Sequence, residues 1–207
     1  MSYAPTIRKI WRGAGGSQIA EFAVCVPLLT VFAVGIFDFS GAFNLKQKMA
    51  GAAQQGALAA ASQPTSDLPD PIVQVGPPPP PSIQAIEKAV FLNLVGQGVL
   101  PGAVYNTTNC GVNVIPTQLN LTWTYVVKGC PGTLTITIDR GCVPSGTQVF
   151  PNCSGSAATG EKILYSHVTI SYPYPWQFQN VIQLVGGSSS LSPSFNINVE
   201  AYAANRS

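Results

Sequence analysis

An apolar run near the N-terminus is the strongest feature in the pattern of hydrophobic and polar positions. From Phe22 to Phe37 no residue is charged, and Asp38 is the only interruption before Phe43. As a helix rising about 1.5 Å per residue, residues 22–43 extend about 33 Å, enough to cross a bilayer hydrocarbon core of about 30 Å. The run therefore predicts a transmembrane helix.

The charges on either side of this run favour a cytoplasmic N-terminus and an exported remainder. Residues 1–15 carry three basic residues and no acid, and two basic residues follow the run: Arg8, Lys9 and Arg12, then Lys46 and Lys48. A cleaved signal peptide is the alternative, but its apolar core is usually only about 7–15 residues long, and no small-x-small site closes this run before the lysines. We interpret residues 1–16 as a basic cytoplasmic leader.

The helix is expected to continue beyond the membrane. Residues 44–61 contain good helix formers and no proline, so residues 17–61 are predicted to form one transmembrane and stalk helix. Its outer half is rich in Ala and Gly, which suits either close packing of backbones or a simple helical stalk. Residues 62–82 contain five consecutive prolines, which exclude helix and indicate an extended linker.

The pattern from residue 83 onward predicts a small exported α+β domain over residues 83–207. Residues 83–100 have helical apolar spacing, and residues 176–185 indicate a second short helix. Four runs alternate apolar and polar residues and are predicted to be strands: 119–126, 133–138, 163–172 and 195–202. A short edge strand is predicted before them at 112–115. Turn residues separate the runs, which favours antiparallel pairing.

The cysteines indicate disulfides in an oxidising compartment. Four of the five follow the membrane segment: Cys110, Cys130, Cys142 and Cys153. Their spacing lacks the short pairs of zinc ribbons. Three connectivities are open, and we favour Cys110–Cys130 with Cys142–Cys153 because nearest neighbours fit the hairpin-like runs. Cys25 lies in the apolar run and is expected to remain reduced.

Composition gives little support to nucleic-acid binding or catalysis. Charged residues make up 9% of the chain and the net charge is +2, so no basic footprint for nucleic acid exists. We find no nucleophile elbow, phosphate loop or paired metal-ligand motif, and we expect no cofactor and no enzyme. The single histidine, His167, lies in a strand run and is interpreted as structural. A catalytic carboxylate pair of Asp139 with Glu161 or Glu200 is conceivable, but no motif in the sequence indicates it.

Two residues of the apolar segment call for a physical account. Glu21 places a carboxylate at the start of the membrane helix, where it can rest at the headgroups or neutralise a positive group inside an assembly. A cut after Gly16 would create such a group, the α-amine of Ser17, four residues before Glu21. Pro27 removes one helix donor and is expected to kink the helix.

The leader and helix together resemble a known family. Gly16, Ser17, Glu21 and Phe22 resemble the prepilin cleavage motif of type IV pilins, with Gly before the cut, Glu at the fifth mature position and an aromatic residue at the sixth. More closely, GGSQIAEFAVCVPLLTVFAVGIF and its alanine-rich continuation to residue 61 are similar to TadE-like proteins, minor pilins or pseudopilins of the bacterial Tad (Flp) pilus system.

The resemblance implies a set of partners and a location. It implies cleavage at Gly16–Ser17 by a prepilin peptidase, single-pass insertion in the bacterial inner membrane with a periplasmic or extracellular domain, contact with other Tad pilus or pseudopilin subunits, and a role in pilus assembly and adhesion. Two alternatives remain at this stage. One is an uncleaved, membrane-anchored binding protein, and the other is a secreted hydrolase.

Overall fold

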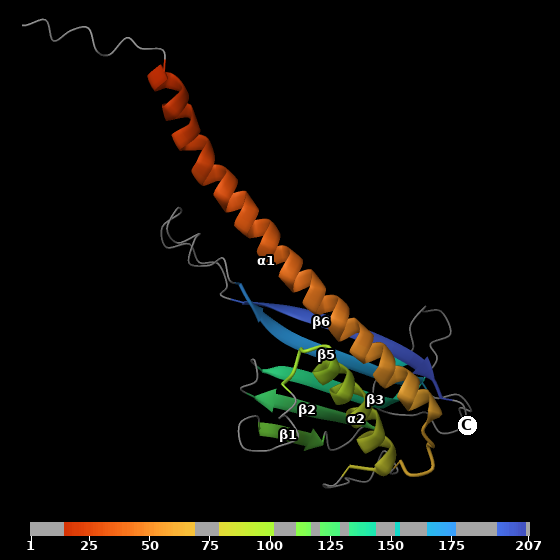
Figure 1. Ribbon diagram of the computed structural model, residues 1–207. Helices are drawn as coiled ribbons and strands as arrows, with labels where there is room; N and C mark the ends of the chain where they lie inside the picture. The colour runs from red at the N-terminus through yellow and green to blue at the C-terminus, as the bar shows by residue number, and fades with distance from the viewer. Residues whose placement is uncertain are drawn as a thin grey trace, which may run out of the picture. The chain divides into compact units, whose positions relative to one another are not determined.

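The computed structural model describes two helices and six strands in residues 15–68, 79–101, 111–116, 121–128, 133–143, 152–153, 165–176 and 194–205. Figure 1 shows the long helix and the sheet. The elements are α1 (Gly15–Ser62), α2 (Pro81–Gly96), β1 (Gly111–Pro116), β2 (Thr122–Lys128), β3 (Leu134–Val143), β4 (Asn152–Cys153), β5 (Tyr165–Pro175) and β6 (Ser194–Ala204).

The predicted α+β class is confirmed: a long apolar N-terminal helix precedes an antiparallel sheet and a second helix. The strands lie in the order β1-β2-β3-β5-β6, and β4 pairs with the end of β3. Every pair is antiparallel, as the short turns between runs predicted. The five predicted strands are all present. The helix predicted over 176–185 falls, from residue 177 on, outside the described residues.

The alternation of side chains places one face of the sheet in the core. In β3, Leu134, Ile136 and Ile138 are fully buried, and in β5 Val168 and Ile170 are too. Register brings these residues together across the strands, because Ile136 lies opposite Ile170 and Ile138 opposite Val168. Period two therefore produces a continuous apolar layer.

β3 extends farther than the sequence pattern predicted. Its register with β5 shifts between Asp139 and Cys142, which marks a bulge, and Asp139, Arg140 and Cys142 are all buried. A bulge interrupts strict alternation, so consecutive polar residues can enter the interior. The two-residue strand β4 pairs with this extension.

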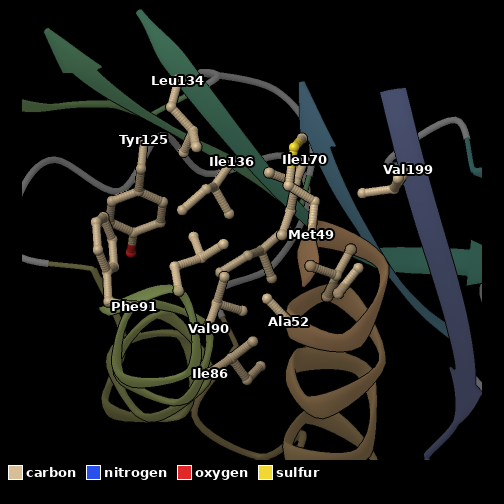
Figure 2. Close-up of a cluster of buried hydrophobic side chains, with 14 of the residues drawn as sticks. Met49, Ala52, Ile86, Val90, Phe91, Tyr125, Leu134, Ile136, Ile170 and Val199 are labelled. Carbon is tan, nitrogen blue, oxygen red and sulfur yellow. The ribbon is translucent and has the colours of Figure 1, made fainter. Parts of the chain in front are cut away.

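The second half of α1 lies in the core and is not a free stalk. Residues Gly41–Trp176 and Ser192–Ser207 form one compact unit, and Met1–Ser40 with Gln177–Leu191 form another, so α1 enters the domain unit at Gly41. Figure 2 shows Met49 and Ala52 of α1 and Val90 of α2 directed toward the sheet. Met49 and Ala52 are fully buried, as are Ala53 and Ala60.

Gly56 explains why α1 carries so many small residues. A Cβ atom at this position would collide with Val90 of α2 and come within 3.3 Å of Val168 of β5. The three elements therefore meet at Gly56, where only hydrogen fits. Small residues along this face allow the backbone of α1 to approach its neighbours closely.

α2 begins two residues earlier and ends four residues earlier than predicted. Pro81 occupies the first turn, where its missing N–H costs nothing. The helix ends because Gly98 adopts a φ of +69°, and the amides of Val99 and Leu100 both donate to the Leu94 carbonyl oxygen, at 2.9 and 3.2 Å.

Arg140 joins the end of α1 to the sheet. Its guanidinium donates to the carbonyl oxygens of Pro64 at 3.1 Å, Ala60 at 3.3 Å and Gln63 at 3.1 Å, and the side chain is completely buried. Burial lowers the pKa of Arg140, and the negative charge of Asp67 opposes this shift. Carbonyls at a helix C-terminus lack helical donors, so a cation here satisfies both hydrogen bonding and the helix dipole.

We predict that Arg140→Met destabilises the fold by about 3 kcal/mol, because three carbonyl groups at the end of α1, one of them in a buried hydrogen bond, would lose a charged donor. The measurement is denaturant unfolding of the full chain in detergent, followed by fluorescence of Trp123, which is buried in β2. Lys88→Met is the matched control, since Lys88 is exposed on α2, and its effect should stay within about 0.5 kcal/mol. Equal effects of the two changes would contradict the role of Arg140.

Candidate functional site

The N-terminal half of α1 presents large apolar side chains to its surroundings. Phe22 is 70% exposed and Phe37 is 78% exposed, and most of the large apolar residues between them are exposed as well: Val24, Val26, Leu28, Leu29, Phe32 and Ile36. Within α1, residues 18–62 are long and apolar enough to cross a membrane. This helix fits a single-pass membrane anchor.

The predicted processing and assembly residues lie within the first two turns of α1. The Gly16–Ser17 peptide is inside the first turn, and the Glu21 side chain is exposed one turn further on. Glycine disfavours helix by about 1 kcal/mol relative to alanine, so a first turn with Gly15 and Gly16 can unwind at small cost. A protease that needs an extended chain could therefore reach this peptide bond.

α1 continues through Pro27 without interruption. Proline has no N–H, so the carbonyl of Ala23 loses its helical donor; the hydroxyl of Thr30 donates to the Val26 carbonyl oxygen at 2.9 Å in the same turn. A kink at Pro27 remains a prediction.

Cys25 is free and exposed. Asp38 is only 6% exposed, so protein atoms surround it.

The two predicted disulfide pairs remain predictions. Cys142 is disulfide-bonded, and the register of β3 with β4 makes Cys153 its Cα partner. Residues directly opposite in an antiparallel pair have Cα atoms about 4.5–5.5 Å apart, within the usual range for a disulfide. Cys110 and Cys130 lie outside the described residues.

A row of polar residues crosses the sheet on the face opposite the helices. Thr122, Asp139, His167 and Tyr202 are successive Cα partners on β2, β3, β5 and β6. The imidazole of His167 stacks on the ring of Tyr202, with centroids 4.1 Å apart. Burial raises the pKa of Asp139, and the Gly141 amide, which donates to it at 2.8 Å, is the main opposing influence. Strand pairing, which local patterns do not reveal, assembles this row.

The contacts of His167 differ from those of a catalytic triad. Its Nε2 atom lies 3.3 Å from a carboxylate oxygen of Glu200 and 3.1 Å from the hydroxyl of Thr169. A triad needs the acid on one ring nitrogen and the nucleophile on the other, whereas here both contacts share Nε2. Glu161 lies outside the described residues. Among those the structure describes, no three His, Cys, Asp or Glu side chains are placed to hold a metal ion.

Comparison with known families identifies the N-terminal segment. Residues 16–58 match the family model for the TadE-like protein. The predicted resemblance to the TadE-like family is thereby confirmed for this segment. No curated protein and no solved structure matches the chain.

The TadE-like segment covers most of α1, in both its N-terminal and its C-terminal half. It begins at Gly16, includes Glu21, Phe22 and Pro27, and ends at Leu58, one turn before the helix ends. It thus contains both the exposed apolar surface and most of the small residues that pack into the domain. The sheet, the clustered cysteines and the polar row lie outside it.

Proposed function

We propose that the protein is a minor pilin or pseudopilin of a Tad pilus system that acts through assembly and surface adhesion, not through catalysis. The observation that carries this proposal is the exposed apolar half of α1 within the TadE-like segment. Such a surface needs lipid before assembly and neighbouring helices after it, because exposed apolar area costs about 25 cal/mol per Å² in water. A membrane-anchored subunit that can enter a fibre meets both requirements.

Glu21 is proposed to set the register between subunits. Cleavage by a prepilin peptidase after Gly16 would leave a positive α-amine on Ser17. In an apolar bundle that amine and the Glu21 carboxylate of a neighbour would each be costly alone, but their pairing compensates both charges. The spacing of four residues between the two groups would then fix the axial offset of adjacent helices.

The remaining features support an exported domain. The N-terminal leader is proposed to lie in the cytoplasm, with the chain inserted in the inner membrane and the domain in the periplasm or outside the cell. We also propose the disulfides Cys142–Cys153 and Cys110–Cys130. The latter pair is supported by the register of β1 with β2, because Gly111, which follows Cys110 in the sequence, is the Cα partner of Lys128, two residues before Cys130. Peptide mapping without reduction would reject this scheme by recovering either crossed pairing.

A permanently anchored binding protein is the second candidate. The polar row and the neighbouring Glu200 favour it, because Glu200 and part of His167 remain exposed on the open face of the sheet. This alternative needs neither cleavage at Gly16 nor a partner for Glu21, and the following two experiments separate it from the pilin function.

The first prediction concerns processing. Protein isolated from the membranes of cells that contain a prepilin peptidase should begin at Ser17, and Gly16→Leu should leave Met1 in place, because the larger side chain would block the peptidase. N-terminal sequencing provides the measurement. Gly35→Leu is the matched control on the same helix, since nothing lies within 4 Å of a Cβ at Gly35, and it should be processed normally. An intact N-terminus in the unaltered protein would exclude cleavage.

The second prediction concerns assembly. Glu21→Ala should leave insertion and folding intact but reduce incorporation into a pilus or pseudopilus complex more than about tenfold, because the neighbour's amine would be buried without a partner. Quantitative immunoblotting of sheared pili and membranes measures the ratio. Gln18→Ala, an exposed neutral change on the same helix, should incorporate normally. Normal incorporation of Glu21→Ala would reject charge pairing.

A further inference from the structure

An aromatic cluster lies where β5 ends and β6 begins. The rings of Tyr174, Trp176 and Phe195 contact one another: Trp176 stacks on Phe195 with centroids 5.3 Å apart, and Tyr174 meets both edge-on at 5.9 and 6.5 Å. Phe195 is 43% exposed although it belongs to the helix-facing side of the sheet. The cluster therefore continues the core layer outward without being enclosed by it.

Contacts with α1 give the level of this cluster along the helix. A Cβ at Gly41 would lie 3.0 Å from the hydroxyl of Tyr174, and a Cβ at Gly56 would lie 3.3 Å from Val168. β5 thus runs antiparallel to α1 (Figure 1). Six strand residues at about 3.3 Å span about 20 Å, close to the 22 Å that fifteen helical residues span, so strand and helix stay alongside each other.

This level coincides with the end of the apolar run. Phe43, two residues beyond Gly41, is 54% exposed and is the last residue of the run, and the exposed Lys46 follows one turn later. If residues 22–43 span the hydrocarbon core, Gly41 lies at its edge. Trp and Tyr are enriched at this depth in membrane proteins, because their rings are apolar and their N–H and O–H groups can reach water and headgroups.

We propose that Tyr174, Trp176 and Phe195 insert into the headgroup layer of the membrane that α1 crosses, and so hold the domain against the bilayer surface at a fixed depth. The proposal rests on the membrane-anchored function and adds a second contact with lipid, made by the sheet. A neighbouring copy of the chain is a less suitable occupant, because the cluster lies at the depth where the helix itself passes from lipid to water.

Lipid quenching of Trp176 tests the contact. The chain has three tryptophans, and Trp123 is buried in the sheet. The full chain carrying Trp11→Phe would be placed in phosphatidylcholine–phosphatidylglycerol vesicles whose lipids carry bromine either high on the acyl chain or near its end. We expect the high bromines to reduce the Trp176 emission by about half and the deep ones to reduce it less. The additional change Trp176→Phe should remove the quenched component.

Leu92 provides the matched control position. It is 55% exposed on α2, near Val90, which meets α1 at the level of Gly56, about 22 Å beyond Gly41 along the axis. A chain with Trp11→Phe, Trp176→Phe and Leu92→Trp should show no quenching by either lipid. Quenching at Leu92→Trp equal to that at Trp176 would overturn the proposal.

Labelling of Cys25 separates this inference from the proposed function. Cys25 is free and exposed in the apolar half of α1, so in an inserted chain a water-soluble maleimide should modify it only after detergent is added, with Cys25→Ser as the control. Protected Cys25 with unquenched Trp176 would overturn the interfacial contact alone. Reactive Cys25 in intact vesicles would reject the membrane anchor, and the inference with it. Protection together with quenching supports both.

Discussion

The buried guanidinium of Arg140 is the interaction on which the domain depends most. It lies within the bulge of β3 and reaches the carbonyl groups at the end of α1, which are 76 to 80 residues away in the sequence. The neighbouring Asp67 carboxylate accepts the Ser82 amide at 2.8 Å in the first turn of α2. One cation and one anion therefore satisfy the end of one helix and the start of the next, where backbone groups have no helical partners.

This arrangement makes α1 both the anchor and part of the domain core. Small residues from Ala52 to Ala60 let the helix lie close to α2 and to the sheet, and Arg140 holds its end. Because Arg140 donates hydrogen bonds to the carbonyl groups at the end of the helix, the last turn of α1 cannot slide relative to β3 without breaking these bonds.

Local patterns were sufficient for the elements but not for the contacts between them. The strands of residues 122–128 and 165–175 follow period two, and the apolar run leaves no alternative to a long helix, so both were predictable. The burial of Arg140 and the short β4 depend on a bulge that alternation does not encode. The row from Asp139 to His167 depends on strand order, and the alanines of α1 are compatible with a stalk until the sheet is placed against them.

Some residues of the candidate site could likewise be predicted from a local motif, and others could not. Gly16 and Glu21 were predicted from the resemblance of a short local motif to the prepilin cleavage site, and the TadE-like match begins at the first of them. Their roles remain predictions. The aromatic cluster could not be predicted, because Tyr174 and Phe195 become neighbours only through the pairing of β5 with β6, and their level becomes known only through Gly41.

The exposed half of α1 imposes one further physical constraint. Its phenylalanines and leucines must be covered, and both available covers, lipid and other apolar helices, have a low dielectric constant. In lipid, Glu21 can remain near the headgroups at the helix end, so its charge costs little. Among helices it has no such access to water and needs a cation at the same depth. Under the proposed pilin function, the same carboxylate would therefore be tolerable in the membrane and selective in an assembly.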